Sequence, residues 1–402
     1  MHKWTVIYLM DCPGNTTTAA KAMFDDILSL TIPDEICISI CLQIPIAAIK
    51  KVDPLYQGPA SGPGQTTLFY QVVRNAGGGS KLKLLNQDGD FDITSSHDVR
   101  LFFQSIHTGE QRAENYMLFT WGHGAAISVF VSGTMQTESH KMLDMMELKE
   151  AILHTFSGKM KLIVMVDCFM QYFDTGLLLH QAQVEYLVAA QYGITFFGYN
   201  YRKIFGELYT NPNISSKQLA TLVIPTRPLS KELRDRLACA AFFATKLSSY
   251  DELVNIMNKL GKRLSEEMDE QPDVIHSAIR SDNYLNGAGK LMDLFVLIYG
   301  IADALGDNWE AQTIAQLRSL QENMFIAKFT GHELNKLDPK IALGLSVSIP
   351  DTSDNHFYNG FVRNNPGSIS GIAVACKEWA TFVDKYVEYA DGLKIQTVLL
   401  TR

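Results

Sequence analysis

Two short apolar runs in the chain, 116–121 (Tyr-Met-Leu-Phe-Thr-Trp) and 161–166 (Lys-Leu-Ile-Val-Met-Val), have the length and continuity of buried strands. Between them, the apolar residues of 146–155 recur at helical spacing, which predicts an amphipathic helix. A strand–helix–strand unit makes the two strands parallel, so their C-terminal ends lie at one edge of a sheet. Ligands and catalytic groups of open α/β sheets gather at that edge, so the residues that follow these strands are the first functional candidates.

The first run leads into Gly122-His123-Gly124 and the second into Asp167-Cys168. We therefore expect His123 and Cys168 to face each other. A thiolate is a nucleophile, and a nearby imidazole can hold it or accept its proton. The glycines let backbone pass close to a substrate, and the Gly124 N–H is a candidate oxyanion donor. Taken singly, such a cysteine is more often a small buried hydrophobe and such a histidine a satisfied polar residue. The pair at two parallel strand ends favours nucleophilic catalysis.

The remaining pattern predicts an α/β protein whose last third is mostly helical. Strands are expected at 4–9, 35–44, 67–73, 81–85, 184–191 and 238–245. Helices are expected at 16–30, 96–107, 171–183, 201–209, 215–223, 250–268, 291–304, 309–323 and 378–390.

Composition narrows the function classes. The chain has 402 residues, of which 47% are hydrophobic and 19% charged, enough for a sizeable core. A net charge of −8 and the lack of a basic run argue against a nucleic-acid partner. No apolar stretch reaches the roughly 18–20 residues of a membrane span, so no membrane partner is expected.

The six cysteines are scattered, and none has zinc-site spacing: Cys12, Cys37, Cys41, Cys168, Cys239 and Cys376. Five of them are expected to be reduced core thiols, which fits a reducing compartment. The acidic run 88–92 (Asp-Gly-Asp-Phe-Asp) resembles the start of a calcium loop. It lacks the glycine and the final acidic residue that an EF-hand needs, because those places hold Ile93 and Val99. A plain acidic turn is expected there, and neither a metal nor a cofactor is expected in the chain.

A family resemblance rests on the two strand ends. Trp-Gly-His-Gly at 121–124 and Asp-Cys-Phe-Met-Gln at 167–171 resemble the active-site pair of the clostripain family, cysteine endopeptidases with a caspase-like fold. Further segments resemble the family's landmarks in the same order, at 3–10, 185–190, 247–253, 291–294 and 344–350. Each motif is weak alone, and their order makes the match specific.

The resemblance implies a caspase-like α/β/α sandwich with a mostly parallel central sheet and a C-terminal helical or mixed subdomain. We expect a catalytic domain at 1–250 and a supporting subdomain at 251–402, packed on it. The implied activity is that of a cysteine endopeptidase acting through a Cys-His dyad and a thioester acyl-enzyme. In that scheme His123 is the general base or acid, Cys168 the nucleophile, and the N–H groups of Gly124 and Cys168 form the oxyanion hole.

Two features of the family raise open questions here. Relatives often mature by an internal cut after the histidine, and Lys141 is the sole Lys or Arg of 128–144, so it is a possible processing site. An uncut surface loop is an equally good interpretation. Relatives that cut after Arg or Lys carry an Asp two positions before the cysteine, where this chain has Val166, with Asp167 next to the nucleophile.

Successive strand side chains point to opposite faces, so Asp167 replaces the missing Asp only if the backbone bulges. The expected substrate pocket comprises Val166, Asp167, Tyr192, Phe196 and Phe197. A buried cation without a carboxylate partner is costly, so apolar or small residues at the cut site are a fair alternative to basic ones.

The substrate is expected to be a protein or peptide, and a regulatory protein partner is possible. The chain opens on a strand after Met1-His2 without a secretory leader, which predicts a cytoplasmic protein, or a secreted one if the sequence was trimmed. Two alternatives remain. One is a catalytically quiet caspase-like module that binds a partner. The other is a cytosolic protease that activates an effector in a bacterial defence or cell-death pathway.

Overall fold

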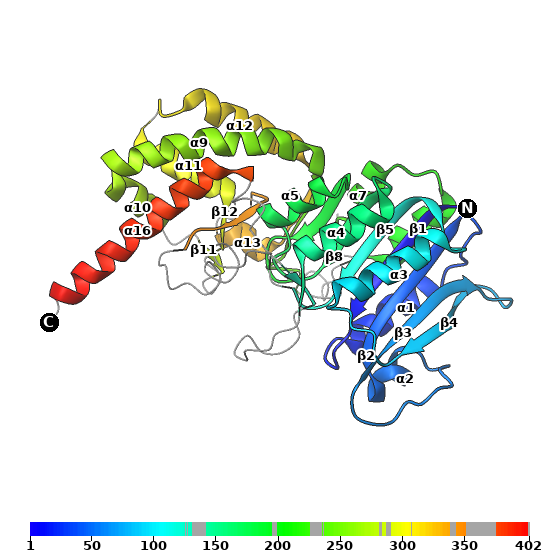
Figure 1. The fold of residues 1–402 in the computed structure, drawn as a ribbon. Coiled ribbons are helices and arrows are strands. Elements are labelled where there is room, and N and C mark those ends of the chain that lie inside the picture. The colour runs from blue at the N-terminus through cyan, green and yellow to red at the C-terminus, as the bar shows by residue number, and fades with distance from the viewer. Residues whose placement is uncertain are drawn as a thin grey trace.

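A computed structural model of the chain describes residues 1–124, 126, 128–130, 142–194, 199–225, 235, 237–280, 284–286, 291–306, 308–337, 343–350 and 375–400. Figure 1 shows an elongated molecule, with a sheet-containing body at the N-terminal end and helices extending to the C-terminus.

The body is built on one nine-stranded sheet. Its five central strands are mutually parallel, and antiparallel pairs complete both edges, so the expected α/β sandwich with a mostly parallel sheet is confirmed. In spatial order the strands are β13 (Phe325–Thr330), β10 (Ala241–Lys246), β9 (Tyr186–Ala190), β8 (Met160–Val166), β5 (Ala113–Trp121), β1 (His2–Asp11), β2 (Ile36–Pro45), β3 (Gln65–Arg74) and β4 (Ser80–Asp88).

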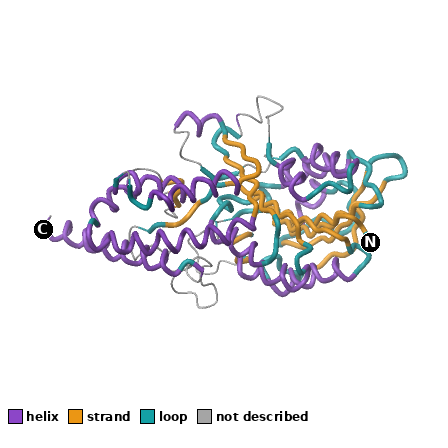
Figure 2. Tube along the Cα trace, turned by 90° about the horizontal axis from the view of Figure 1, so that it is seen from above, coloured by secondary structure: helices purple, strands orange, loops and turns teal. Residues whose placement is uncertain are grey.

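Helices cover both faces of the sheet, as Figure 2 shows from above. One face carries α3 (Ser96–Thr108), α4 (Met145–Phe156) and α5 (Phe173–Gln181), and the other α1 (Thr17–Leu28), α6 (Tyr201–Thr210) and α7 (Ser216–Val223). Alternate residues of one strand therefore enter different cores: Leu118 of β5 packs with α3 and α4, whereas Phe119 packs with α1 and α6. Both faces being covered explains why the central strands are continuously apolar.

The C-terminal part is organised around the packing of α9 (Tyr250–Glu270) against α16 (Lys377–Leu400). The two helices come into direct backbone contact at Gly261, where an added Cβ would lie 2.3 Å from the Trp379 nitrogen. Beside them lie α10 (Pro272–Arg280), α11 (Leu294–Leu305) and α12 (Ala311–Met324), and a small sheet of β11 (Tyr284–Asn286), β12 (Leu291–Asp293) and β14 (Ser346–Ser348).

Two expectations change in this part. The first three residues of the helix expected at 291–304 form strand β12 instead. Helix α11 starts only at Leu294, because Asp293 accepts hydrogen bonds from the first helical N–H groups. Strand β13, unexpected from the sequence, lies beyond residue 250 yet pairs with β10 in the main sheet. The two parts of the chain thus share one sheet.

Short elements complete the fold: η1 (Ile46–Ala48), α2 (Ile49–Val52), β6 (Ser128–Val129), β7 (Leu143–Asp144), η2 (Leu247–Ser249) and α13 (His332–Leu337). Within the described residues, no helix is long and apolar enough to cross a membrane.

The acidic run at 88–92 is a turn whose carboxylates accept local N–H groups. Asp88 Oδ1 accepts from the Asp90 nitrogen at 2.8 Å, and Asp92 Oδ1 from the Thr94 nitrogen at 2.9 Å. No group of three or more His, Cys, Asp or Glu side chains that could hold a metal occurs among the described residues.

Candidate active site

The candidate site lies at the C-terminal edge of the two neighbouring parallel strands β5 and β8. Trp121, the last residue of β5, pairs with Val166, the last residue of β8. His123 and Cys168 each follow that pair by two positions. The prediction that both strand ends share one edge is therefore confirmed, and the two residues start from the same level of the sheet, about 5 Å apart across the strands.

The Cys168 thiol is half-buried beneath the segment that follows β9. The Ile194 N–H donates to Cys168 Sγ at 3.4 Å, and the Ile194 carbonyl oxygen lies 3.9 Å from the same sulfur. Burial raises the pKa of Cys168, the Ile194 hydrogen bond lowers it, and the charge of Asp167 raises it; the net direction is upward. The resting sulfur is therefore a thiol at neutral pH.

The His123 side chain is exposed, and the glycines on either side allow its loop to lie close against the sheet edge. A Cβ on Gly124 would lie 2.6 Å from Cβ of Asp167 and 3.2 Å from Met170 Sδ. A Cβ on Gly122 would lie 3.0 Å from a ring carbon of Phe130. The histidine loop and the cysteine turn are thus in direct contact, and a side chain at Gly124 would separate them.

Left-handed backbone is concentrated at this edge. Ala126, Phe130 and Phe169 have φ angles of 61°, 59° and 61°, values that non-glycine residues rarely adopt. The surroundings hold these conformations: the Thr175 hydroxyl donates to the Ala126 carbonyl at 2.6 Å, and the Phe169 N–H donates to the Tyr192 carbonyl at 3.1 Å. Such backbone strain persists where the surrounding structure imposes it, and it is frequent at functional sites.

Asp167 is fully buried and points away from the face that Cys168 occupies. Thr120 Oγ1 donates to Asp167 Oδ2 at 2.5 Å, and Thr120 shares the sheet face of Leu118, whereas Val166 and Cys168 pack on the opposite core. No bulge interrupts the β5–β8 pairing near Val166. Burial raises the pKa of Asp167 to about 7, against the lowering effect of Thr120, and the charge of Asp11 adds to the rise. Asp167 Oδ1 has no hydrogen-bond partner within the described part of the chain.

The other expected pocket residues are Val166, Tyr192, Phe196 and Phe197. Val166 is buried at the end of β8. Tyr192 is half-buried beside the cysteine turn, and its pKa is raised by burial first and by the charges of Asp293 and Cys239 next. Phe196 and Phe197 lie outside the described residues, as does Lys141. The pocket remains a prediction.

Sequence reasoning missed Ile194, which contacts the sulfur. Its contribution is a backbone N–H, and no side-chain pattern signals that. It also missed Gln191, whose amide reaches Asp293 Oδ2 at 2.6 Å in the C-terminal part.

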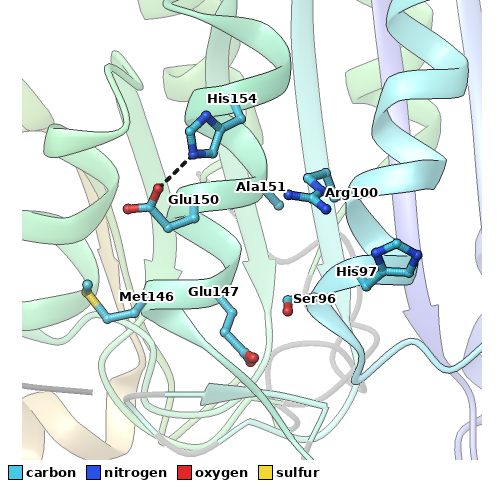
Figure 3. A pocket seen from close by; sticks show the side chains of 8 residues that line it. All are labelled: Ser96, His97, Arg100, Met146, Glu147, Glu150, Ala151 and His154. Carbon is cyan, nitrogen blue, oxygen red and sulfur yellow. Dashed lines mark ion pairs between the residues drawn. The ribbon is translucent and has the colours of Figure 1, made fainter. Parts of the chain in front are cut away.

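A groove of about 370 Å³ lies elsewhere, between α3 and α4. Figure 3 shows its side chains, with the ion pair of His154 Nε2 and Glu150 Oε2 at 3.1 Å. It is lined by Ser96, His97, Arg100, Met146, Glu147, Glu150, Ala151 and His154. None of the candidate catalytic residues lines it, and its charges are of both signs.

The buried carboxyl of Asp167 leads to a prediction about pH. Its pKa is raised from 3.8 to about 7, so the unfolded chain ionises first and stability is lost as the pH rises from about 4 to about 7. The Asp167→Asn variant has no carboxyl to ionise, so it should avoid up to about 4 kcal/mol of this loss in the free energy of unfolding. It should therefore be more stable than the wild type at about pH 8. Denaturant unfolding at a series of pH values measures it.

The exposed carboxyl of Asp90 provides the control, because Asp90→Asn should leave the pH profile of stability as it is in the wild type. Equal pH slopes for Asp167→Asn and wild type would contradict an ionising Asp167 in the buried site.

Comparison with known proteins identifies the family. The model of the clostripain family, Peptidase_C11, matches residues 78–386. No curated protein matches the chain. A secreted C11 cysteine protease from Bacteroides thetaiotaomicron, "iotapain", has a similar structure, with a TM-score of 0.62 at 14% identity over 95% of this chain and 99% of that chain. A secreted C11 cysteine protease of the same organism in complex with an irreversible peptide inhibitor gives 0.61 at 13% identity, over 96% and 99%.

An inactive zymogen C11 protease from Parabacteroides distasonis gives a TM-score of 0.57 at 12% identity, over 82% of this chain and 83% of that chain. At these identities the likeness to solved structures concerns the fold, and it is the same α/β fold with a helical extension that the chain adopts. The family model covers more than half of the chain, and the two strand ends that it spans carry a histidine and a cysteine at one sheet edge. The chain belongs to the clostripain family of cysteine peptidases.

Proposed function

We propose that this cysteine peptidase is an endopeptidase in which Cys168 is the nucleophile and His123 the general base and acid. The observation that carries the proposal is the register of β5 and β8, with Trp121 opposite Val166, which starts both residues from one level of the sheet. Direct contact between the Gly124 backbone and the 167–170 turn supports it, because the loops that carry the two residues adjoin.

The raised pKa of Cys168 gives the histidine a defined task. Because the resting sulfur holds its proton, attack requires a base at the moment of reaction. In the proposed sequence His123 accepts the thiol proton as Sγ bonds to the substrate carbonyl carbon. The peptide C–N bond then breaks, the amine leaves with the proton from His123, and a thioester remains. Water, deprotonated by His123, attacks the thioester, and the carboxylic acid leaves as the sulfur regains its proton.

The oxyanion that forms in both attacks needs donors fixed beforehand. We propose the N–H groups of Gly124 and Cys168. Support comes from the close approach of the two segments that carry them, because the Gly124 backbone packs against Asp167, the residue before Cys168.

The proposed primary pocket contains Val166 and Tyr192, together with Phe196 and Phe197 of the following segment. Asp167 adjoins this pocket in sequence, but its carboxyl hydrogen-bonds Thr120 on the other face of the sheet. Val166 and Tyr192, the residues of this pocket that the structure describes, bring no carboxylate, which favours apolar or small residues at the cut site over Arg or Lys.

Maturation by self-cleavage within 128–144, with Lys141 as the cut site, belongs to the same proposal. The segment's two ends are joined by antiparallel pairing, Ser128 with Asp144 and Val129 with Leu143, so after a cut between them the two fragments keep this pairing. The similar Parabacteroides distasonis protein is described as an inactive zymogen.

Peptides or proteins are the proposed substrates, and the structurally similar protease in complex with a peptide inhibitor supports that class. A cytoplasmic location is also proposed. The six cysteines all lie as free thiols, which suits a reducing compartment, although two similar proteases are described as secreted.

The catalytic roles are tested by two substitutions. Cys168→Ala should abolish peptide hydrolysis because no nucleophile remains, and His123→Ala should lower kcat/KM by about 10²–10⁴-fold through loss of the base. Steady-state assays on a peptide mixture, with circular dichroism to verify folding, measure both effects.

Cys239 is the matched control, since it is exposed whereas the four cysteines other than Cys168 and Cys239 are buried. Cys239→Ala should keep full activity. A peptidyl electrophile should label Cys168 alone, while iodoacetamide reaches Cys239 as well. Turnover that survives in Cys168→Ala, or peptidyl label shared equally with Cys239, would overturn the assignment.

For processing, we expect purified wild-type protein to yield two fragments cut within 128–144, and Cys168→Ala to stay intact, because the cut depends on the chain's own nucleophile. Intact-mass spectrometry measures this. Lys141→Ala separates a cut at that residue from one elsewhere in the segment. Full activity of an uncut chain would show that cleavage is unnecessary.

For specificity, matched substrates that differ only at the cut-site residue should show kcat/KM for an apolar or small residue at least equal to that for Arg. Val166→Asp should shift preference towards Arg, because it supplies the buried carboxylate that a cation needs. A wild-type preference for Arg of about a hundredfold or more, lost in Asp167→Asn, would instead indicate an acidic pocket.

A further inference from the structure

Asp293 is a buried carboxylate with both oxygens occupied by N–H donors. Oδ1 accepts from the backbone nitrogens of Phe295 at 2.9 Å and Val296 at 3.0 Å. Oδ2 accepts from Gln191 Nε2 at 2.6 Å and from the backbone nitrogens of Leu343 and Gly344 at 2.8 and 2.9 Å. The residue is 1% exposed. Five donors thus share the two oxygens of one carboxylate, so an amide at this position would place its own N–H₂ donors opposite some of these N–H groups.

Four of the donors belong to the C-terminal part, and the fifth, Gln191, belongs to the catalytic body. Gln191 directly follows β9, and its own N–H donates to the Ala241 carbonyl at 2.9 Å. The residues after it contact the nucleophile's turn twice: the Tyr192 carbonyl accepts from the Phe169 N–H at 3.1 Å, and the Ile194 N–H donates to Cys168 Sγ at 3.4 Å. Gln191 is therefore the anchor from which the segment 192–194 reaches the sulfur.

A second connection joins the same junction to the cysteine turn. Asp293 pairs with Ser346 across β12 and β14, and the Ser346 N–H donates to the Gln171 carbonyl at 2.9 Å. The turn 168–171 is thus held from both sides by groups that meet at Asp293.

We propose that Asp293 and Gln191 are positioning residues for the cysteine chemistry, holding the 192–194 segment so that the Ile194 N–H stays against Cys168 Sγ. The proposal rests on the proposed role of Cys168 as nucleophile. Its consequence is that the C-terminal part of the chain, which contributes neither the nucleophile nor the base, sets the reactivity of the sulfur.

The chemistry at the sulfur makes this contact consequential. An N–H that donates to sulfur stabilises the thiolate over the thiol, whereas burial does the reverse. The Ile194 N–H is the cause that lowers the pKa of Cys168 at this site, so losing it leaves burial and the Asp167 charge, which both raise that pKa.

The test uses Gln191→Met, which keeps the length of the side chain and removes the amide. It is made in a Cys239→Ala background so that iodoacetamide reports on Cys168. The rate of Cys168 alkylation, followed by mass spectrometry across pH, gives the thiol's titration without any peptide substrate. We expect the midpoint to move to higher pH and the rate at about pH 7 to fall roughly threefold to tenfold, the effect of one hydrogen bond. In peptide assays kcat should fall while KM changes little.

Gln321→Met is the matched control. Gln321 Nε2 donates to the Leu343 carbonyl at 3.1 Å, so this variant loses an amide contact to the same loop that Asp293 holds, without touching Gln191. It should keep the wild-type alkylation profile.

A folded Asp293→Asn variant should reproduce the shift seen in Gln191→Met. An unchanged alkylation profile in folded Gln191→Met overturns the proposal, as does an equal shift in Gln321→Met, which would indicate general loosening. Because alkylation needs no peptidase activity, these results are separate from loss of the proposed function, which Cys168→Ala tests.

Discussion

The parallel pairing of β5 and β8 is the constraint on which the rest of the structure depends. It places Trp121 opposite Val166, and from that pair two short connections lead to His123 and Cys168. Parallel strands require a crossover, and α4 supplies it, begun by a capping box in which Asp144 and Glu147 satisfy each other's backbone N–H groups. The polar chemistry can then lie on loops while the apolar strands beneath hold those loops rigid.

Strand alternation divides the edge into two environments with different roles. Cys168 and Val166 belong to one face of the sheet. Asp167 and Thr120 belong to the other, and Asp167 lies against Gly124. A carboxyl buried there, with Asp11 adding like charge, is stabilised in its neutral form. Where Asp167 does ionise, its charge raises the pKa of the neighbouring Cys168 thiol. The same alternation separates the two side chains, one on each face of the sheet.

How much the sequence predicts depends on whether the signal is local. The runs 116–121 and 161–166 indicate buried strands, so their shared sheet edge can be predicted, with His123 and Cys168 each two residues beyond it. Strand β13 could not be predicted, because its residues are half-exposed and its partner β10 lies far away in sequence. The segment 291–304 is mostly apolar on both sides of Asp293, which hides the switch from strand to helix at that residue. Ile194 contacts the sulfur through its backbone, so its identity carries no signal.

The chain's two parts are therefore one folding unit in a specific physical sense. A carboxylate buried as deeply as Asp293 is costly unless it is fully hydrogen-bonded, and one of its five donors, Gln191, comes from the body that holds Cys168. The apolar core on the α3–α5 face of the sheet also continues into α9, α11 and α16 without a break. Separating the parts would expose that core and leave both Asp293 and Gln191 short of a partner. Asp293 thus links the C-terminal part to the end of β9, which lies beside Cys168 although Asp293 is more than a hundred positions away in sequence, and the cost of leaving Asp293 unsatisfied favours keeping that link.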